Sequence, residues 1–273
     1  MLCLGSLQYT GLVTTKVPDF FPKMPMTKLT RRQLMLTCTA AASLAAIPTL
    51  KAAESGRFRA KLKSGTKPAL TPGEIVLADH AGRRDLLYVP PSYDAAKPAP
   101  FVMFLHGARG DGDRNLAQER AAADANGTLV LSPSTRSGTW DAIQGNFAAD
   151  FDALDALLQQ AFDRCNIDPM HMAVGGMSDG ASYGITLGLI NGDLFSHVIA
   201  HSPGFIITDN WHGKPKVFVS HGRQDNILPF EQCGAAIVAR LKSKNYDVRF
   251  DIFDGGHTAT PEMRSTALAW LKS

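Results

Sequence analysis

Along residues 74–273, the pattern of hydrophobic and polar positions switches repeatedly between the one typical of strands and the one typical of helices. Short apolar or β-branched runs are separated by longer amphipathic stretches, which is typical of βαβ units and predicts a mainly parallel sheet. The central runs, such as FVMFL and KVFVS, are apolar on both faces, so we expect helices to cover both sides of the sheet. Strands are predicted at 74–78, 85–89, 101–105, 128–131, 171–174, 197–201, 216–220 and 247–253, and helices at 114–126, 148–165, 179–191, 230–244 and 261–272.

This pattern divides the chain of 273 residues into three parts. Residues 1–52 form a leader, and residues 53–73, with scattered Gly, Pro, Lys and Ser, are expected to be a linker or an N-terminal arm. Residues 74–273 form one α/β domain without an internal repeat or an insertion long enough for a second domain. With 45% hydrophobic and 19% charged residues, the composition is that of an ordinary globular protein.

The leader has the features of an export signal. Arg31 and Arg32 stand directly before an apolar stretch, residues 34–47, which resembles a twin-arginine signal. We therefore expect the export machinery to bind the leader and the product to be periplasmic or secreted. Translation is expected to begin at Met24 or Met26 and cleavage to follow Ala52. The alternatives are a membrane anchor or an amphipathic helix, but no other stretch approaches the roughly 20 apolar residues of a membrane-spanning helix.

Charge and cysteine content narrow the possible partners. Residues 1–52 hold six Lys or Arg and one Asp, which leaves 22 basic and 24 acidic residues in the rest of the chain. Without an excess of positive charge, nucleic acid is not an expected partner. Cys165 and Cys233 remain after cleavage, either as a disulfide or as two free buried thiols. No HExxH or CxxC spacing is present, so no metal site is predicted.

A candidate nucleophile lies between a predicted strand and a predicted helix. Gly176, Ser178 and Gly180 form a GxSxG motif there, and this strand, turn and helix setting is the one in which the motif presents a serine hydroxyl above a sheet. The glycines prevent Cβ collisions, and the helix N-terminus favours developing negative charge. The alternative is a glycine-rich helix packed closely on the sheet with an incidental serine.

A serine hydroxyl needs a base, and the base needs an orienting group. His257 follows the last predicted strand and gives the order serine, acid, histidine along the chain. His201, at the end of another strand, is the rival base. Asp225 follows the strand at 216–220 and is preferred as the acid, because Asp254 lies only three residues before His257 and would have to double back.

Two backbone amides are predicted to form an oxyanion hole. The strand at 101–105 ends in a His-Gly turn, from which Ala108 donates one N–H, and Asp179, the residue after the nucleophile, donates the other. Aromatic residues in predicted loops beyond the strand ends are candidates for lining an acyl pocket or for ordinary core packing. They are Trp140 and Phe205, together with Phe147 and Trp211.

In combination, LHGARGDGDRN, GMSDGASYGITLGLINGDLFSHVIAHSPGF, VFVSHGRQDNILP and FDGGHT resemble the α/β-hydrolase superfamily. Within it, the chain looks like the bacterial phospholipase/carboxylesterase and polyhydroxybutyrate-depolymerase-like esterases over about residues 74–272. The resemblance implies an eight-stranded, mostly parallel sheet flanked by helices. It also implies a Ser178, Asp225 and His257 triad, no cofactor, and ester hydrolysis through an acyl-enzyme. No long lid insertion is visible, which favours small or polymeric esters.

Two alternatives to an esterase use the same fold. A peptidase or thioesterase employs the same triad and oxyanion hole. A hydrolase-fold protein without turnover would act as a binding protein, since a fold alone does not establish an activity. The complete set of motifs argues against this last alternative.

Overall fold

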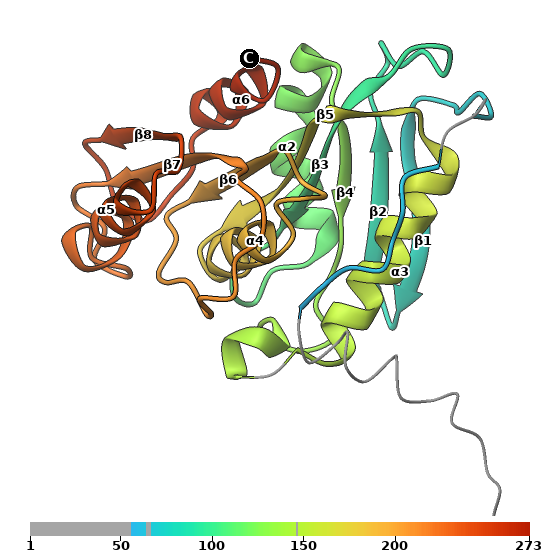
Figure 1. Ribbon diagram of the computed structural model, residues 1–273. Coiled ribbons are helices and arrows are strands. Elements are labelled where there is room, and N and C mark those ends of the chain that lie inside the picture. Colours follow the sequence, from blue (N-terminus) through green and yellow to red (C-terminus); the bar gives the residue numbers. More distant parts are fainter. Residues whose placement is uncertain (1–55, 64–66, 146) are drawn as a thin grey trace, which may run out of the picture. The chain divides into compact units, whose positions relative to one another are not determined.

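Eight strands form one sheet in the computed structural model, which describes residues 56–63, 67–145 and 147–273 (Figure 1). Their order is β1-β2-β4-β3-β5-β6-β7-β8, and pairing is antiparallel for β1 with β2 and for β2 with β4, and parallel from β4 to β8. The leader expected at residues 1–52 lies outside the described residues. The strands are β1 (Gly73–His80), β2 (Arg83–Val89), β3 (Ala99–Leu105), β4 (Leu129–Ser132), β5 (Ile167–Met177), β6 (His197–His201), β7 (Lys216–Gly222) and β8 (Val248–Phe253).

Helices cover both faces of this sheet, as the apolar strands predicted (Figure 1). Successive residues of β3 point to opposite sides: Met103 packs in one core with Phe151 of α3, and Phe104 packs in another with Leu116 of α2. Helices α3, α4 and α5 contribute to the first side, and α2 and α6 to the second. The helices are α2 (Gly112–Asn126), α3 (Ala149–Arg164), α4 (Asp179–Ile190), α5 (Ala236–Ser243) and α6 (Pro261–Trp270).

The predicted helices and strands are all present, and the differences lie at their ends. Strand β5 begins at Ile167, four residues before the predicted start. The helix predicted at 230–244 begins with a π-helical turn, η2 (Glu231–Ala235), and continues as α5. A short 3-10 helix, η1 (Asp141–Gln144), was not predicted. These features depend on contacts distant in sequence, which local periodicity does not contain.

Residues 56–63 form an arm that contacts α3 and the end of α4. The ring of Phe58 stacks on Phe151 with centroids 5.0 Å apart. The backbone amides of Arg59 and Ala60 donate to one carboxylate oxygen of Asp155, at 2.8 and 2.9 Å. Buried apolar area and charge-assisted hydrogen bonds therefore hold this part of the arm on the domain.

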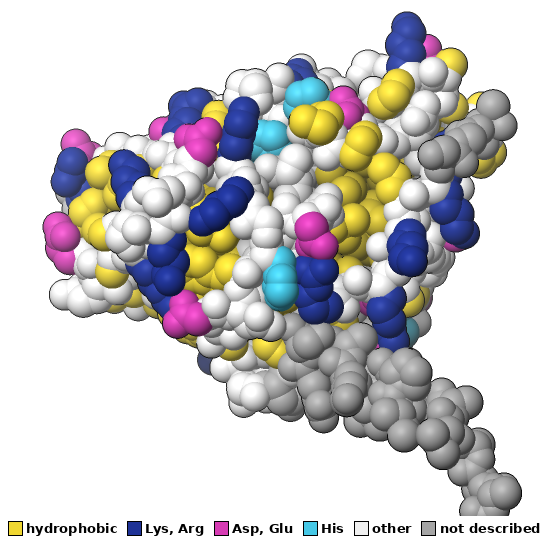
Figure 2. Space-filling model, in the orientation of Figure 1, with side chains coloured by type: hydrophobic (Ala, Val, Ile, Leu, Met, Phe, Trp, Pro, Cys, Tyr) yellow, Lys and Arg dark blue, Asp and Glu magenta, His cyan; other side chains and the backbone are white. Residues whose placement is uncertain are grey.

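Charged side chains of both signs are interspersed on the face shown in Figure 2, around several hydrophobic patches. No helix within the described ranges is both long and apolar enough to cross a bilayer. Both Cys165 and Cys233 are buried free thiols, and burial raises the pKa of Cys165 to about 12. Between β1 and α6, the longest segment outside helices and strands is residues 202–215, so this part of the chain has no lid domain.

Candidate active site

A sharp turn joins β5 to α4 and carries Ser178 at its apex. Ser178 has φ 58° and ψ −121°, a backbone conformation that residues other than glycine rarely adopt. Neighbouring backbone is too close for side chains on either side: a Cβ at Gly176 would lie 2.5 Å from the carbonyl oxygen of Leu105, and one at Gly180 would lie 2.5 Å from that of His106. The two glycines of the motif thus allow the strained turn that presents the serine.

The structure brings Ser178, His257 and Asp225 together. The Nε2 atom of His257 lies 2.8 Å from Ser178 Oγ, and its Nδ1 atom lies 2.7 Å from Asp225 Oδ2. The three residues follow β5, β8 and β7, and the carboxyl ends of these parallel strands lie at one edge of the sheet. The imidazole is therefore positioned to take the serine proton while its other nitrogen donates to a carboxylate.

Asp225 is held as a carboxylate by several donors. Its side chain is fully buried, and Oδ1 accepts hydrogen bonds from the amides of Ile227 at 3.0 Å and Leu228 at 2.8 Å. Burial opposes ionisation, but the hydrogen bonds from Leu228, His257 and Ile227 outweigh it and lower the pKa of Asp225. A permanently ionised carboxylate is what is needed to fix the tautomer of His257.

The rival acid and the rival base lie elsewhere. The side chain of Asp254 is 86% exposed and faces Arg223. His201 is fully buried, its Nδ1 lies 2.6 Å from Ser220 Oγ, and its Nε2 has no partner within the described residues. Burial lowers the pKa of His201 to about 4. Neither side chain is placed to act on Ser178.

The turn after β3 passes directly beside the serine. A Cβ at Gly107 would lie 3.2 Å from Ser178 Cβ. The turn is fixed by the amide of Arg109, which donates to Gly138 at 2.7 Å, and by that of Gly110, which donates to Gly107 at 3.1 Å. The backbone N–H groups of Ala108 and Asp179 have no acceptor in the part of the chain that the structure describes. Both are thus available to a bound group.

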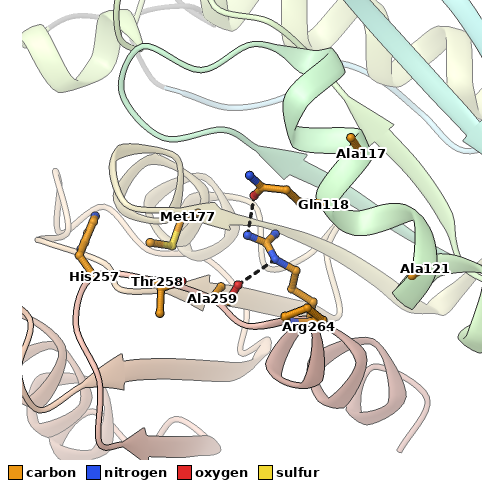
Figure 3. Close-up of a pocket in the computed structure, with 9 residues that line it drawn as sticks. Ala117, Gln118, Ala121, Met177, His257, Thr258, Ala259 and Arg264 are labelled. Carbon is orange, nitrogen blue, oxygen red and sulfur yellow. Dashed lines mark hydrogen bonds between the residues drawn. The ribbon is translucent and has the colours of Figure 1, made fainter.

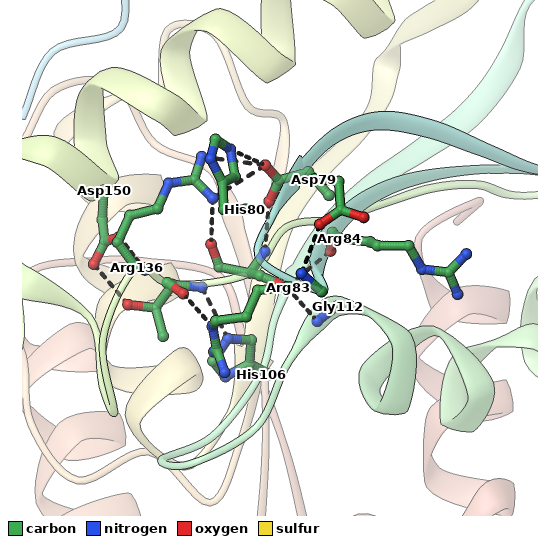
Figure 4. A network of polar contacts seen from close by, with 12 residues as sticks. Asp79, His80, Arg83, Arg84, His106, Gly112, Arg136 and Asp150 are labelled. Carbon is green, nitrogen blue, oxygen red and sulfur yellow. Dashed lines mark hydrogen bonds and ion pairs between the residues drawn. The ribbon is translucent and has the colours of Figure 1, made fainter.

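A polar network holds this turn in place (Figure 4). The Thr135 amide donates to His106 Nε2 at 3.1 Å, so the proton of the neutral ring is on Nδ1, which donates to Gly107 at 2.7 Å. Burial lowers the pKa of His106 and keeps the ring neutral. Arg83 donates to the carbonyl oxygens of Thr135 and Gly110 at 2.8 and 2.7 Å. Arg83 of β2 thereby ties the end of the turn at Gly110 to the segment after β4 that contains Thr135.

Trp140 and Phe205 were predicted to contact substrate, and the prediction for Trp140 is wrong. Its side chain is 1% exposed, its Nε1–H donates to the carbonyl of His106 at 2.9 Å, and its ring lies 4.7 Å from the His106 ring. Trp140 therefore packs beneath the turn and has no surface to offer a substrate. Phe205, in the segment after β6, is 44% exposed, and its contact with substrate stays a prediction.

Two neighbours of the site were not predicted from the sequence. Thr139 Oγ1 donates to the side chain of Asp179 at 2.6 Å, and His221 Nε2 lies 3.2 Å from Asp225 Oδ2. The hydrophobic pattern around Asp179 and Asp225 contains nothing that would identify Thr139 and His221 as their neighbours. Among the described residues, no group of three or more His, Cys, Asp or Glu side chains is arranged to hold a metal ion.

Comparison with known proteins agrees with this fold. The structure is similar to that of esterase PE8, with a TM-score of 0.56 and 21% identity over 68% of this chain and 96% of that one. It is also similar to the S-formylglutathione hydrolase FrmB of Staphylococcus aureus, with a TM-score of 0.58 and 18% identity over 77% of this chain and 100% of that one. These likenesses and the sheet topology define an α/β-hydrolase fold.

Sequence comparison gives the family. The model of the phospholipase/carboxylesterase family matches residues 134–272, just over half of the chain, and the chain belongs to that family. A relative, the probable feruloyl esterase C of Aspergillus oryzae, is 26% identical over 230 residues, which cover 72% of this chain and 83% of that protein. The protein is accordingly a carboxylic ester hydrolase, as the sequence motifs predicted.

Proposed function

We propose that this esterase is a serine hydrolase that works through an acyl-enzyme. The observation that carries the proposal is the position of His257, with one ring nitrogen 2.8 Å from Ser178 Oγ and the other 2.7 Å from Asp225 Oδ2. Ser178 acts as the nucleophile, His257 as the general base and acid, and Asp225 as the group that orients and stabilises the imidazolium.

The reaction proceeds in two displacements. Ser178 Oγ attacks the ester carbonyl while its proton moves to His257 Nε2, and the resulting oxyanion accepts hydrogen bonds from the amides of Ala108 and Asp179. The bond to the alcohol oxygen then breaks as His257 returns the proton to it. Water, deprotonated by His257, attacks the acyl-serine and releases the acid with Ser178 restored.

A fluorophosphonate probe tests the nucleophile, because it forms a stable adduct with an activated serine. The wild-type protein is expected to be labelled and the Ser178→Ala variant is not. Ser243→Ala, on the exposed surface of α5, is the matched control and should label normally. Equal labelling of Ser178→Ala and the wild type would overturn the proposal.

For the substrate, we propose hydroxycinnamate esters as the first class to test, because the matched relative is named a probable feruloyl esterase. The cavity beside His257, about 480 Å³, is large enough to hold one part of such an ester. Release of ferulate from methyl ferulate, compared with hydrolysis of nitrophenyl acetate, thioester and peptide substrates, is the direct measurement. Faster turnover of the thioester or the peptide would contradict this choice.

We also propose that the protein is exported to the periplasm or secreted, on the strength of Arg31, Arg32 and the apolar stretch that follows them. Replacement of both arginines by lysine keeps the charge and is expected to leave the precursor in the cytoplasm. N-terminal sequencing of the exported product is expected to begin after Ala52. Unchanged export of the double variant would contradict the twin-arginine route.

A further inference from the structure

A cavity of about 480 Å³ opens beside His257 and Met177, the residue before Ser178 (Figure 3). Its remaining wall comes from α2, α6 and the segment before α6. Most of these residues are small or apolar: Ala117, Ala121, Ala259 and Pro261. Among the residues that the structure describes, no Asp or Glu lines the cavity, and the polar side chains besides His257 are Gln118, Thr258 and Arg264.

Arg264 is fixed rather than free to bind a ligand anion. Its side chain is 5% exposed and forms a buried ion pair with Glu119, and its Nε–H donates to the carbonyl of Ala259 at 3.2 Å. Burial lowers the pKa of Arg264 to about 10, which still leaves the group protonated at neutral pH. Since Glu119 balances its charge, Arg264 acts as a rigid hydrogen-bond donor to Gln118, which also lines the cavity.

The orientation of the Gln118 side-chain amide follows from the chemistry of arginine. A guanidinium has only donors, so the Gln118 atom that lies 2.7 Å from it must be the amide oxygen. The amide nitrogen therefore points away from Arg264, and its two N–H groups have no acceptor within the described ranges. Gln118 and Met177 also line a second cavity of about 270 Å³ along the turn after β3. The N–H groups of Gln118 are thus exposed at the wall that the two cavities share, and the hydrogen bond from Arg264 to the amide oxygen fixes their direction.

We propose that the larger cavity receives the alcohol part of the ester and that Gln118 donates a hydrogen bond to an oxygen atom on it. This inference rests on the proposed function: His257 returns its proton to the leaving alcohol oxygen, so the alcohol must leave beside His257, which lines this cavity. The apolar wall accepts the carbon skeleton, and without a lining carboxylate a cationic alcohol finds no counter-charge. The preferred substrates are esters of oxygen-bearing alcohols, such as polyols, sugars or hydroxy acids.

Acetates of one chain length test this assignment. Heptyl acetate is compared with 2-butoxyethyl, 3-propoxypropyl and 4-ethoxybutyl acetate, in which an ether oxygen replaces one methylene at successive positions. For at least one ether, the ratio of its kcat/KM to that of heptyl acetate is expected to fall about fivefold in Gln118→Leu, the effect of one neutral hydrogen bond. Gln160→Leu on α3 is the matched control and leaves all ratios unchanged.

A second series places the ether oxygen on the other side of the ester. Methyl octanoate and its ether analogues, in which an oxygen replaces one methylene of the acyl chain, share the methyl alcohol, so Gln118→Leu is expected to leave their ratios as in the wild type. Unchanged ratios in the acetate series, or a fall confined to the methyl esters, would overturn the assignment. Ser178→Ala is measured with every ester: if it retains hydrolysis, the proposed mechanism fails, an outcome that is separate from the behaviour of Gln118→Leu.

Discussion

The imidazole of His221 faces the same oxygen of Asp225 that His257 contacts, with its Nε2 atom 3.2 Å from Oδ2. The same nitrogen lies 2.8 Å from the carbonyl oxygen of Leu228, so it must carry the proton. His221 is fully buried, and the ring packs against Gly234 of η2, where any side chain would overlap it. His221 therefore holds the loop that delivers Asp225, and its Nε2 atom lies beside the carboxylate.

Replacement of His221 by leucine is expected to lower kcat about tenfold, because the loop that positions Asp225 loses the hydrogen bond from His221 Nε2 to the carbonyl of Leu228. Steady-state kinetics on one nitrophenyl ester, together with thermal unfolding, measures the loss. His221→Gln, which can place an amide N–H near the same position, is expected to restore part of the rate. An unchanged kcat in His221→Leu would contradict this positioning role.

Asp225→Asn is expected to lower kcat by roughly 10³- to 10⁴-fold, because an amide cannot hold the required tautomer of His257 or stabilise its cation. The matched control is Asp254→Asn, whose side chain is exposed and three residues from the same histidine. Steady-state kinetics on one nitrophenyl ester compares the two variants. Similar losses in both would show that the acid was assigned to the wrong residue.

Buried His201 predicts acid sensitivity of the fold. Its pKa is lowered by burial to about 4, whereas an unfolded histidine titrates near 6.5. As pH falls below about 6.5 the unfolded state takes up the proton first, so stability is present above that pH and declines towards pH 4. The difference amounts to about 2–3 kcal/mol at pH 4.5.

Urea unfolding at pH 7.5 and pH 4.5 measures this effect. His201→Asn keeps a polar group facing Ser220, so the loss of stability between the two pH values is expected to be about 2 kcal/mol smaller than in the wild type. His197, whose pKa burial likewise lowers to about 4, His106 and Asp225 add to the pH dependence of both proteins. An identical loss in wild type and variant would contradict the assignment to His201.

The close packing around the turn that carries Ser178 requires glycine at position 180. Gly180→Ala is expected to destabilise the fold by several kcal/mol and abolish hydrolysis, because its Cβ would overlap the carbonyl oxygens of Leu105 and His106. Gly138→Ala is the control, since a Cβ there meets nothing within 4 Å. Thermal unfolding and esterase assays compare the variants, and a stable, active Gly180→Ala protein would refute the steric argument.

Periodicity identified the strands and most of the helices of the domain because the strands are apolar on both faces and the helices are long. The same topology placed Asp225 and His257 at one edge of the sheet, and the preference for Asp225 over Asp254 followed from strand order. The prediction for Trp140 failed because a loop aromatic beyond a strand end can equally pack inwards, and its indole N–H found a backbone carbonyl. His221 and Gln118 depend on contacts that local sequence patterns do not encode.

The central claim is that Ser178 carries the acyl group between the two displacements, and intact-protein and peptide mass spectrometry of a rapidly quenched reaction tests it most directly. Wild-type protein mixed with excess nitrophenyl acetate is expected to yield one acetyl group on the peptide that contains Ser178. The Ser178→Ala variant is expected to yield none and to release no burst of nitrophenol. An acetyl group on another residue of the active wild type, or a burst that persists in Ser178→Ala, would contradict the account.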